Sequence, residues 1–340
     1  MSTHNDVSDG LNRSITTNID EIIQEIQSES GFFSEDLIGE SKWWNSEVAG
    51  AKHFSGIIDG KPAVLKLQLV KIDAPEVTLI ENYHKFNKSS HIRAPYIYYH
   101  KPWDDNKNYE AIIMEKVEKV PVINYPSNIH EIEEFHFYFK EYKLNTDVSD
   151  PWLDLPEERS SVEFIEKKFA KWKDMRSKVT KNTDVLTETD EALIADGIKK
   201  LVSFYTDEVE LEFVHGHFGP QDLSKVDKDK AVVFSNLYWS WRYPYYDLVF
   251  GFHYFKYFLA NTSSVTREIY MTNSQLWQEC MVKTAKSLSN FDEKTLNAAI
   301  LERLLAGLNL DYLTVGRDKP MFNILLDETR AEISKYIKLI

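Results

Sequence analysis

Residues 215–223 read HGHFGPQDL, and two further stretches follow, AVVFSN at 231–236 and YYDLVF at 245–250. The first stretch lies in a short β-like region between helical segments, and its glycines and proline are typical loop residues. It places the polar side chains of His217 and Asp222 in one loop. We interpret these three stretches as the part of the chain that decides the fold and carries the chemistry.

A lysine inside an apolar strand is the second informative feature. Lys66 stands in the run AVLKLQ at 63–68, where an uncompensated ammonium group is costly, so an anion is expected beside it. Glu76 comes early in the helix predicted after this strand, Glu81 follows one and a half turns later, and either could reach back to Lys66. Taken alone, Lys66 is more simply a lysine with its head in water, and Glu76 is typical of a helix start.

The first third of the chain predicts a small sheet with one helix laid across it. Two apolar or β-branched runs, at 53–58 and 63–69, are joined by Asp59-Gly60, which is a hairpin signal. Isoleucines at helical spacing predict a short amphipathic helix before this sheet. In order, the predicted elements are a polar tail over 1–17, a helix over 19–26, the hairpin, a helix that begins at Asp73-Ala74-Pro75-Glu76, and strands at 95–99 and 109–114.

The rest of the chain predicts a mostly helical unit. Helical spacing recurs over 129–142, 160–178 and 189–205, and it returns from residue 247 to the C-terminus. We therefore expect an α+β protein with three parts. These are a tail and short helix over 1–33, a sheet-and-helix unit over 34–117, and a helical unit over 118–340 that contains the loop region 213–236.

The motifs resemble the aminoglycoside phosphotransferase and choline kinase branch of the protein-kinase-like fold, over roughly residues 40–300. In that family a strand lysine binds nucleotide phosphates and pairs with a helix glutamate. A loop of the form H-G-D-x-x-x-x-N supplies the catalytic base and a metal ligand, and a later strand supplies the second metal ligand. The spacings between positions 217, 222, 235 and 247 match this pattern. The resemblance implies a two-lobed fold with a small antiparallel sheet and helix in the N-lobe and a mostly helical C-lobe.

The resemblance also implies ATP and Mg²⁺ as cofactors. Lys66 would hold the phosphates of the nucleotide, with Glu76 or Glu81 as its ion-pair partner. Backbone groups of Glu115 and Val117, in the hinge after the last predicted strand, would hold the adenine.

The chemical residues of the family are replaced in this chain. His217 stands where the family has its base aspartate, Asp222 where it has the ligand asparagine, and Ser235 where it has the metal aspartate, so Asp222 would be the remaining metal ligand. The glycine-rich nucleotide loop is reduced to Gly50. Because phosphoryl transfer depends on positioning and on Mg²⁺, we expect a pseudokinase that is impaired in catalysis and binds ATP.

Two other functions stay open. Histidine can act as a base near neutral pH, so His217 and Asp222 could serve an active small-molecule O-phosphotransferase. His215 and His217 alternate along an extended segment, and with Asp222 they could instead bind Zn²⁺ in a metal-binding protein or hydrolase. The expected partner is a small molecule with a hydroxyl or amine group, or a protein bound to the helical lobe.

Residues beside the loop have both structural and functional interpretations. Asp247 is expected to accept backbone hydrogen bonds from the preceding loop and to cap its helix. The aromatic residues between 238 and 246 form either core packing or a wall for a cationic ligand. Acidic residues before position 160 are either a solvated connection or a place for substrate amines, and they are Asp147, Asp150, Asp154, Glu157 and Glu158.

The composition narrows the function classes. The 340 residues carry 40 basic and 54 acidic side chains, a net charge of −14, which argues against a protein that coats nucleic acid. A single cysteine, Cys280, excludes a disulfide framework and points to a reducing compartment. The N-terminus has no signal-peptide pattern, and the longest apolar stretch, 245–260, is too short and too charged to span a bilayer. We therefore expect a cytoplasmic protein without nucleic-acid or membrane partners.

Overall fold

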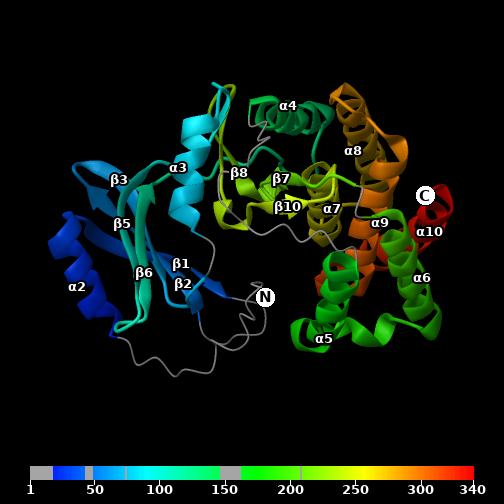
Figure 1. Ribbon diagram of the computed structural model, residues 1–340, viewed down its shortest axis with the longest axis horizontal. Coiled ribbons are helices and arrows are strands. Elements are labelled where there is room, and N and C mark those ends of the chain that lie inside the picture. The colour runs from blue at the N-terminus through cyan, green and yellow to red at the C-terminus, as the bar shows by residue number, and fades with distance from the viewer. Residues whose placement is uncertain (1–17, 43–48, 73–74, 146–161, 207–208) are drawn as a thin grey trace. The chain divides into compact units, whose positions relative to one another are not determined.

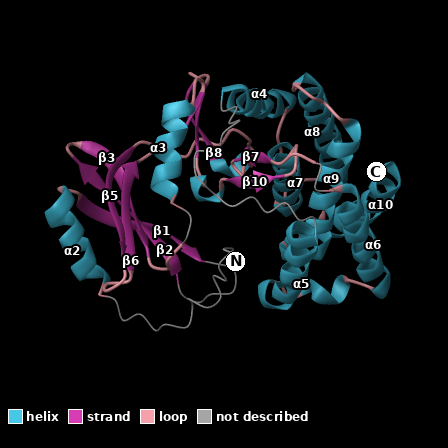
Figure 2. Ribbon diagram, in the orientation of Figure 1, coloured by secondary structure: helices cyan, strands magenta, loops and turns pink. Residues whose placement is uncertain are grey.

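The computed structural model describes residues 18–42, 49–72, 75–145, 162–206 and 209–340. The chain divides into two compact units, one rich in strands and one rich in helices (Figures 1 and 2). The N-terminal unit comprises residues 1–87, 93–119 and 232–237, and the helical unit comprises 88–92, 120–231 and 238–340.

The N-terminal unit is built on a five-stranded antiparallel sheet of order β1-β2-β3-β6-β5. The predicted hairpin is present, and Asp59 and Gly60 turn the chain with positive φ angles of 49° and 72°, as a two-residue hairpin turn requires. The elements of this unit are α2 (Ile19–Ser30), β1 (Phe33–Lys42), β2 (Ala49–Ile58), β3 (Lys61–Gln68), α3 (Glu76–Phe86), β5 (Ile97–Asp104) and β6 (Tyr109–Glu115). Of the predicted helix start, Asp73 and Ala74 lie outside the described residues.

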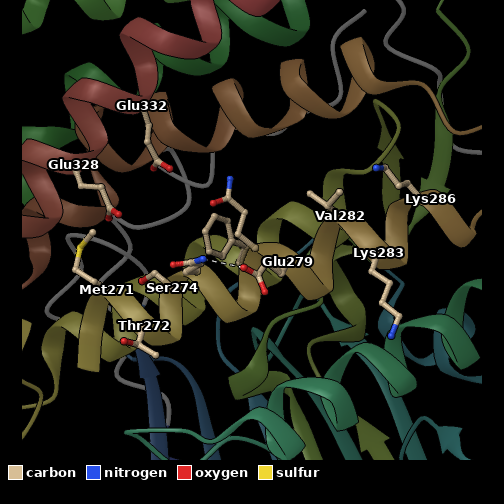
Figure 3. Close-up of a pocket in the computed structure, with 12 residues that line it drawn as sticks. Met271, Thr272, Ser274, Glu279, Val282, Lys283, Lys286, Glu328 and Glu332 are labelled. Carbon is tan, nitrogen blue, oxygen red and sulfur yellow. Dashed lines mark hydrogen bonds between the residues drawn. The ribbon is translucent and has the colours of Figure 1, made fainter. Parts of the chain in front are cut away.

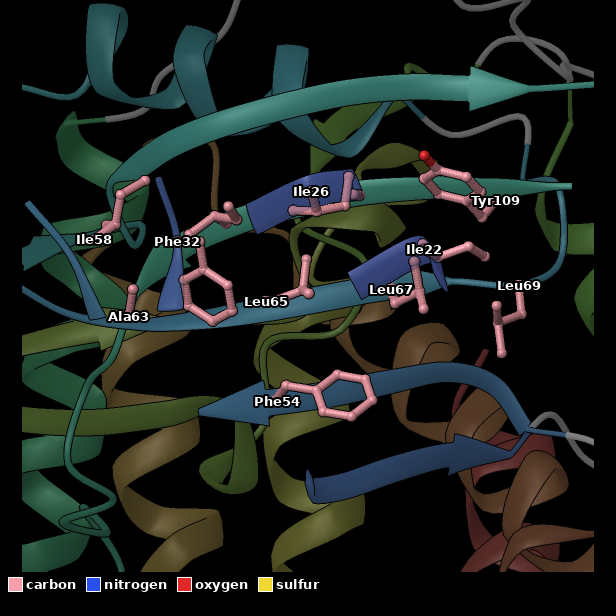
Figure 4. Close-up of a cluster of buried hydrophobic side chains, with 12 residues drawn as sticks. Ile22, Ile26, Phe32, Phe54, Ile58, Ala63, Leu65, Leu67, Leu69 and Tyr109 are labelled. Carbon is pink, nitrogen blue, oxygen red and sulfur yellow. The ribbon is translucent and has the colours of Figure 1, made fainter. Parts of the chain in front are cut away.

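The two faces of this sheet bury different partners because side chains alternate along a strand. Leu65 and Leu67 of β3 lie on the face that is covered by Ile22 and Ile26 of α2 (Figure 4). Lys66 therefore points to the opposite face, where the apolar side chains of Val64, Ile97, Ile112 and Met114 pack with Val77 of α3.

Strand β1 was not predicted from the sequence. Its residues, FSEDLIGESK, include Ser, Glu, Asp and Gly, which are uncommon in strands. The strand forms by pairing with β2 at the edge of the sheet, with three register shifts along its length. Phe33, Leu37 and Ile38 are exposed, so no alternating pattern marks the strand.

The helical unit packs around one buried helix. Nearly every residue of α9 from Leu296 to Asn309 is buried, and this helix contacts α5, α6, α7 and α10. The helices of this unit are α4 (Ile129–Asn145), α5 (Lys168–Val179), preceded by a π-helical segment at Val162–Lys167, α6 (Glu188–Phe204), α7 (Tyr246–Asn261), α8 (Arg267–Ser287), α9 (Glu293–Asn309) and α10 (Phe322–Leu339). None of the described helices combines the length and the apolar character needed to cross a bilayer.

Short strands position the loop of interest. β7 (Glu212–Val214) pairs with β10 (Ser240–Arg242) in an antiparallel ribbon. A three-stranded sheet has the order β4-β9-β8, formed by Ile92–Arg93, Lys230–Val233 and Leu223–Asp227. The stretch 215–223 therefore runs from the end of β7 to the start of β8.

Candidate functional site

Lys66 and Glu76 form an ion pair in the N-terminal unit. The Nζ atom of Lys66 lies 2.5 Å from Oε2 of Glu76, and the two side chains are 9% and 13% exposed. α3 begins at Glu76, so this carboxylate lies in the first turn, where the helix dipole favours a negative charge. Glu81, the other predicted partner, is exposed on the same helix. The structure thus brings Lys66 together with Glu76 and not with Glu81.

His53 lies on the same face of the sheet as this pair, and the sequence analysis did not single it out. The register of β2 and β3 places His53 opposite Lys66, so the two side chains share a face of the sheet. Burial lowers the pKa of His53, and the charge of Lys66 lowers it further. The signal was present in the sequence, because a two-residue turn at Asp59-Gly60 fixes which residues of a hairpin pair.

The predicted adenine-binding segment follows the last strand of the sheet. The side chain of Glu115 makes a bidentate ion pair with Arg93, with distances of 2.6 and 2.7 Å, and its backbone N–H donates to the carbonyl of Tyr96. Arg93 also stacks over the Tyr96 ring, 4.4 Å from its centroid. Val117 follows β6 outside regular structure and is half-buried. Arg93 therefore holds the end of β6 in place, a role that the sequence did not indicate.

The loop after β7 is held by buried hydrogen bonds within the helical unit. The backbone N–H of His215 donates to the hydroxyl of Tyr142 at 2.7 Å, and Nδ1 of its ring accepts from the N–H of His217 at 3.3 Å. Gly216 has a φ of 76°, and a Cβ at this position would lie 2.3 Å from the carbonyl oxygen of Tyr238. Only glycine fits there. His215 is fully buried and has a structural part in this loop.

Asp247 anchors the same loop from the first turn of α7. Its Oδ1 accepts from the N–H of Gly216 at 2.9 Å, and its Oδ2 accepts from the hydroxyl of Tyr142 at 2.9 Å. The prediction that it binds the preceding loop is confirmed, whereas the N-cap position of α7 is held by Tyr245, without a side-chain cap. Burial raises the pKa of Asp247 to about 6, against the opposing effect of the Tyr142 hydrogen bond.

The free energy of unfolding of the Asp247→Asn variant is expected to depend less on pH than that of the parent protein. A carboxyl group whose pKa rises on folding binds its proton more tightly in the folded state, so its contribution to stability is largest below about pH 4. That contribution falls by about 3 kcal/mol as the pH rises to 7. Asparagine carries no charge and keeps an oxygen for Gly216. Urea unfolding of both proteins at pH 4, 5, 6 and 7 measures the difference, and parallel pH profiles would contradict the raised pKa.

His217 and Asp222 form a second pair, in the loop between β7 and β8. The Nδ1 atom of His217 lies 2.9 Å from Oδ2 of Asp222, and the side chains are 25% and 6% exposed. An ionised carboxylate only accepts hydrogen bonds, so it fixes the proton of a neutral His217 ring on Nδ1 and leaves Nε2 as an acceptor. The ring stacks on Tyr238 at 4.6 Å and contacts Phe250 at 4.7 Å.

The residues at the predicted metal positions fit Mg²⁺ poorly. Asp222 offers a carboxylate that already accepts from His217, and Ser235, with a left-handed φ of 62°, offers a neutral hydroxyl. The amide of Asn236 is buried and donates to the carbonyl of Val233. Mg²⁺ in nucleotide sites is usually held by one or two carboxylates. The described residues also contain no group of three His, Cys, Asp or Glu side chains that could hold a metal ion, so His215, His217 and Asp222 do not form the zinc site weighed above.

The aromatic segment between 238 and 246 packs inside the helical unit. Tyr243 stacks on Tyr205 at 3.7 Å, and Trp239 packs on Phe213 at 5.5 Å. The ring of Tyr246 is already approached by three cations of the chain, Lys168, Arg242 and Arg303, at 4.9–5.2 Å. These contacts favour core packing over a wall for a cationic ligand. The acidic residues weighed as a place for substrate amines, 147 to 158, lie outside the described residues.

Several solved structures with a similar architecture are phosphotransferases. Aminoglycoside phosphotransferase APH(4)-Ia has 12% sequence identity and a TM-score of 0.58, over 95% of this chain and 99% of that chain. Spectinomycin phosphotransferase APH(9)-Ia, solved with ADP and spectinomycin, has 11% identity and a TM-score of 0.53, over 96% and 98% of the two chains. A microcompartment-associated aminopropanol kinase has 9% identity and a TM-score of 0.58, over 94% and 95%.

The likeness lies in the structure and not in the sequence. No model of a known protein family matches the chain, and no curated protein matches it either. The solved structures align with more than nine-tenths of the chain at identities of 9–12%. The chain therefore has the protein-kinase-like α+β fold of small-molecule phosphotransferases, as its motifs predicted.

Proposed function

We propose that this protein binds a nucleoside triphosphate on its N-terminal unit and is impaired in phosphoryl transfer. The observation that carries the proposal is the pair of Lys66 and Glu76, at 2.5 Å on the α3 face of the sheet. In protein kinases the equivalent lysine–glutamate pair must be in place for the nucleotide to be held productively. Such a pair would be retained if the chain still binds phosphates.

The nucleotide would be held by three groups of the N-terminal unit. The ammonium of Lys66 would bind phosphate oxygens through charge-assisted hydrogen bonds, while Glu76 keeps the ammonium oriented. Backbone groups of Glu115 and Val117 would bind the adenine, as in the family that the sequence resembles. Arg93 binds the carboxylate of Glu115, so this side chain is not available to the nucleotide. Recognition of the adenine at this position would therefore fall to the backbone, which supports the assignment.

The chemistry of the loop favours weak or absent transfer. A general base supplies about 10²–10⁴-fold in rate, and His217 could replace the missing aspartate in that part. The second metal carboxylate has no replacement, because Ser235 offers only a hydroxyl. The ion it would hold supplies several kcal/mol of charge stabilisation in the transition state.

A second candidate function is supported by the His217–Asp222 pair. A base must be within hydrogen-bond reach of its proton and is commonly oriented by a third group. The side chain of Asp222 is 6% exposed and that of His217 is 25% exposed. Asp222 would orient the His217 ring in this way. An active phosphotransferase would then use Nε2 of His217 to accept the proton of a substrate hydroxyl. As the proton leaves, the substrate oxygen would attack the terminal phosphorus of the nucleotide. The bond from this phosphorus to the bridging oxygen would break, and the nucleoside diphosphate would depart.

The partner of this protein would be a small molecule with a hydroxyl or amine group. Among the similar structures, one of aminoglycoside phosphotransferase APH(4)-Ia contains hygromycin B, and that of APH(9)-Ia contains spectinomycin. For an impaired protein, a protein partner on the helical unit would be the alternative. A cytoplasmic location remains our expectation from the single cysteine.

A thermal-shift titration with ATP tests the proposal. We expect ATP to raise the melting temperature in the absence of metal, by several degrees at about a hundred times its dissociation constant. Addition of Mg²⁺ or Mn²⁺ should change the shift little, because the metal ligands are incomplete. A shift that requires Mg²⁺, together with ADP release in the presence of a hydroxyl substrate, would favour the active phosphotransferase. A protein that ATP does not stabilise under either condition would contradict both.

A further inference from the structure

An open groove of about 870 Å³ runs between α8 and α10 of the helical unit (Figure 3). Phe252 of α7 also lines it. Phe250, two residues earlier on α7, contacts His217 instead. Two residues correspond to about 200° around a helix, so the groove lies on the other side of α7 from His217. It is a site separate from the loop described above.

One end of the groove carries an excess of negative charge. The ammonium of Lys256, which is 1% exposed, is shared by two carboxylates of α10, Glu328 at 2.8 Å and Glu332 at 3.0 Å. Tyr270 adds a neutral hydrogen bond to Glu328. One cation thus balances only one of the two carboxylates, and these side chains are 21% and 17% exposed, with both residues lining the groove.

A buried hydroxyl in the groove has no partner among the described residues. Ser274 of α8 is 5% exposed, its Oγ has no hydrogen-bond partner in that part of the chain, and the residue lines the groove. Leaving such a group unpaired costs free energy that a bound ligand with a donor can recover.

The rest of the lining defines the ligand further. Met271, 44% exposed, and Phe252 provide apolar walls beside the carboxylates. Lys283 and Lys286 lie at the other end of the α8 side (Figure 3), and Met271 and Lys286 are separated by about 22 Å along the helix. The groove thus changes from negative charge at the carboxylates to positive charge at the lysines. A ligand with one cationic group and a short, mostly apolar body fits this arrangement.

We propose that the α8–α10 groove binds an organic cation whose ammonium or guanidinium group lies against Glu328 and Glu332 and hydrogen-bonds to Ser274. Carboxylates bind a guanidinium through paired, charge-assisted hydrogen bonds. The net charge of −14 also raises the local concentration of cations near the protein. This site is independent of nucleotide binding, so it stands or falls separately from the proposed function.

Isothermal titration calorimetry with butylguanidine tests the proposal, with butylurea as a neutral probe of similar shape. We expect saturable binding of one butylguanidine and none of butylurea. The Glu332→Gln variant should bind butylguanidine about tenfold more weakly, and Ser274→Ala should weaken binding by a smaller factor. Glu332→Gln should still fold, because Lys256 keeps its pair with Glu328, and a melting curve of the variant without ligand checks this.

Glu279→Gln is the matched control, since Glu279 lines the same groove and does not pair with Lys256. It should bind butylguanidine within about twofold of the parent protein, as expected for a screened surface charge. Absence of butylguanidine binding, equal binding of butylurea, or equal losses in Glu279→Gln and Glu332→Gln would each overturn the proposal.

Discussion

Replacement of Glu302 by glutamine is expected to lower the free energy of unfolding by about 3–5 kcal/mol, the usual cost of breaking a buried ion pair. Glu302 lies on the buried helix α9 and is 1% exposed. Its Oε1 accepts from Nζ of Lys168 at 2.7 Å and from Nη2 of Arg303 at 3.2 Å. The variant would leave both cations beside a neutral amide, and an arginine cannot lose its charge.

The titration of Glu302 points the same way. Burial alone would raise its pKa, but Lys168 and Arg303 lower it to about 2. A carboxyl group with a lowered pKa stabilises the fold above its unfolded pKa, near pH 4.5, and this contribution is lost as the pH falls toward 2. The difference in stability between parent and variant should therefore be full at pH 7 and should shrink below pH 4.

Urea unfolding at pH 7 measures the effect of Glu302→Gln. Glu293→Gln is the matched control, because Glu293 is an exposed glutamate in the first turn of the same helix. It should cost no more than about 1 kcal/mol, the value of one charge at a helix end. Equal losses in the two variants would show that the buried charges are compensated without Glu302.

The sequence predicted the fold well where a local signal had one structural solution. The Asp59-Gly60 turn fixed the hairpin, and the isoleucines of α2 marked the face that packs on the sheet. β1 was missed because it is an edge strand whose large side chains face solvent. Its conformation is imposed by hydrogen bonds to β2 and not by its own residue preferences.

The sequence predicted that Lys66 has a carboxylate partner, but not which glutamate of the following helix it is. The sequence alone allows either Glu76 or Glu81 to reach Lys66. Five residues turn a helix by about 140° beyond a full circle, so only one of the two can face the sheet. The residue at which α3 begins decides which glutamate this is. The helix begins at Glu76, and Glu76 is the glutamate that pairs with Lys66. The groove beside Lys256 could not be foreseen, because its carboxylates come from α10, more than seventy residues further along the chain.

Replacement of Lys66 by methionine is expected to weaken ATP binding by roughly 10–100-fold, the effect of one or two charge-assisted hydrogen bonds. Methionine keeps most of the apolar stem that packs in the sheet, so the fold should survive. Glu76, at 13% exposure, can be hydrated once its partner is gone. At an ATP concentration of about a hundred times the parent's dissociation constant, the thermal shift of the variant should accordingly fall to between about half and about one-seventh of the parent's shift.

Lys52→Met provides the matched control for this loss. Lys52 also pairs with a glutamate at 2.5 Å, but the side chains of Lys52 and Glu40 are 25% and 33% exposed. The strand register places Lys52 opposite Leu67, hence on the other face of the sheet from Lys66. ATP should stabilise this variant as much as the parent protein. If ATP stabilised the Lys66 variant to the same extent, Lys66 would not be a phosphate ligand, and the ion pair with Glu76 would serve the fold alone.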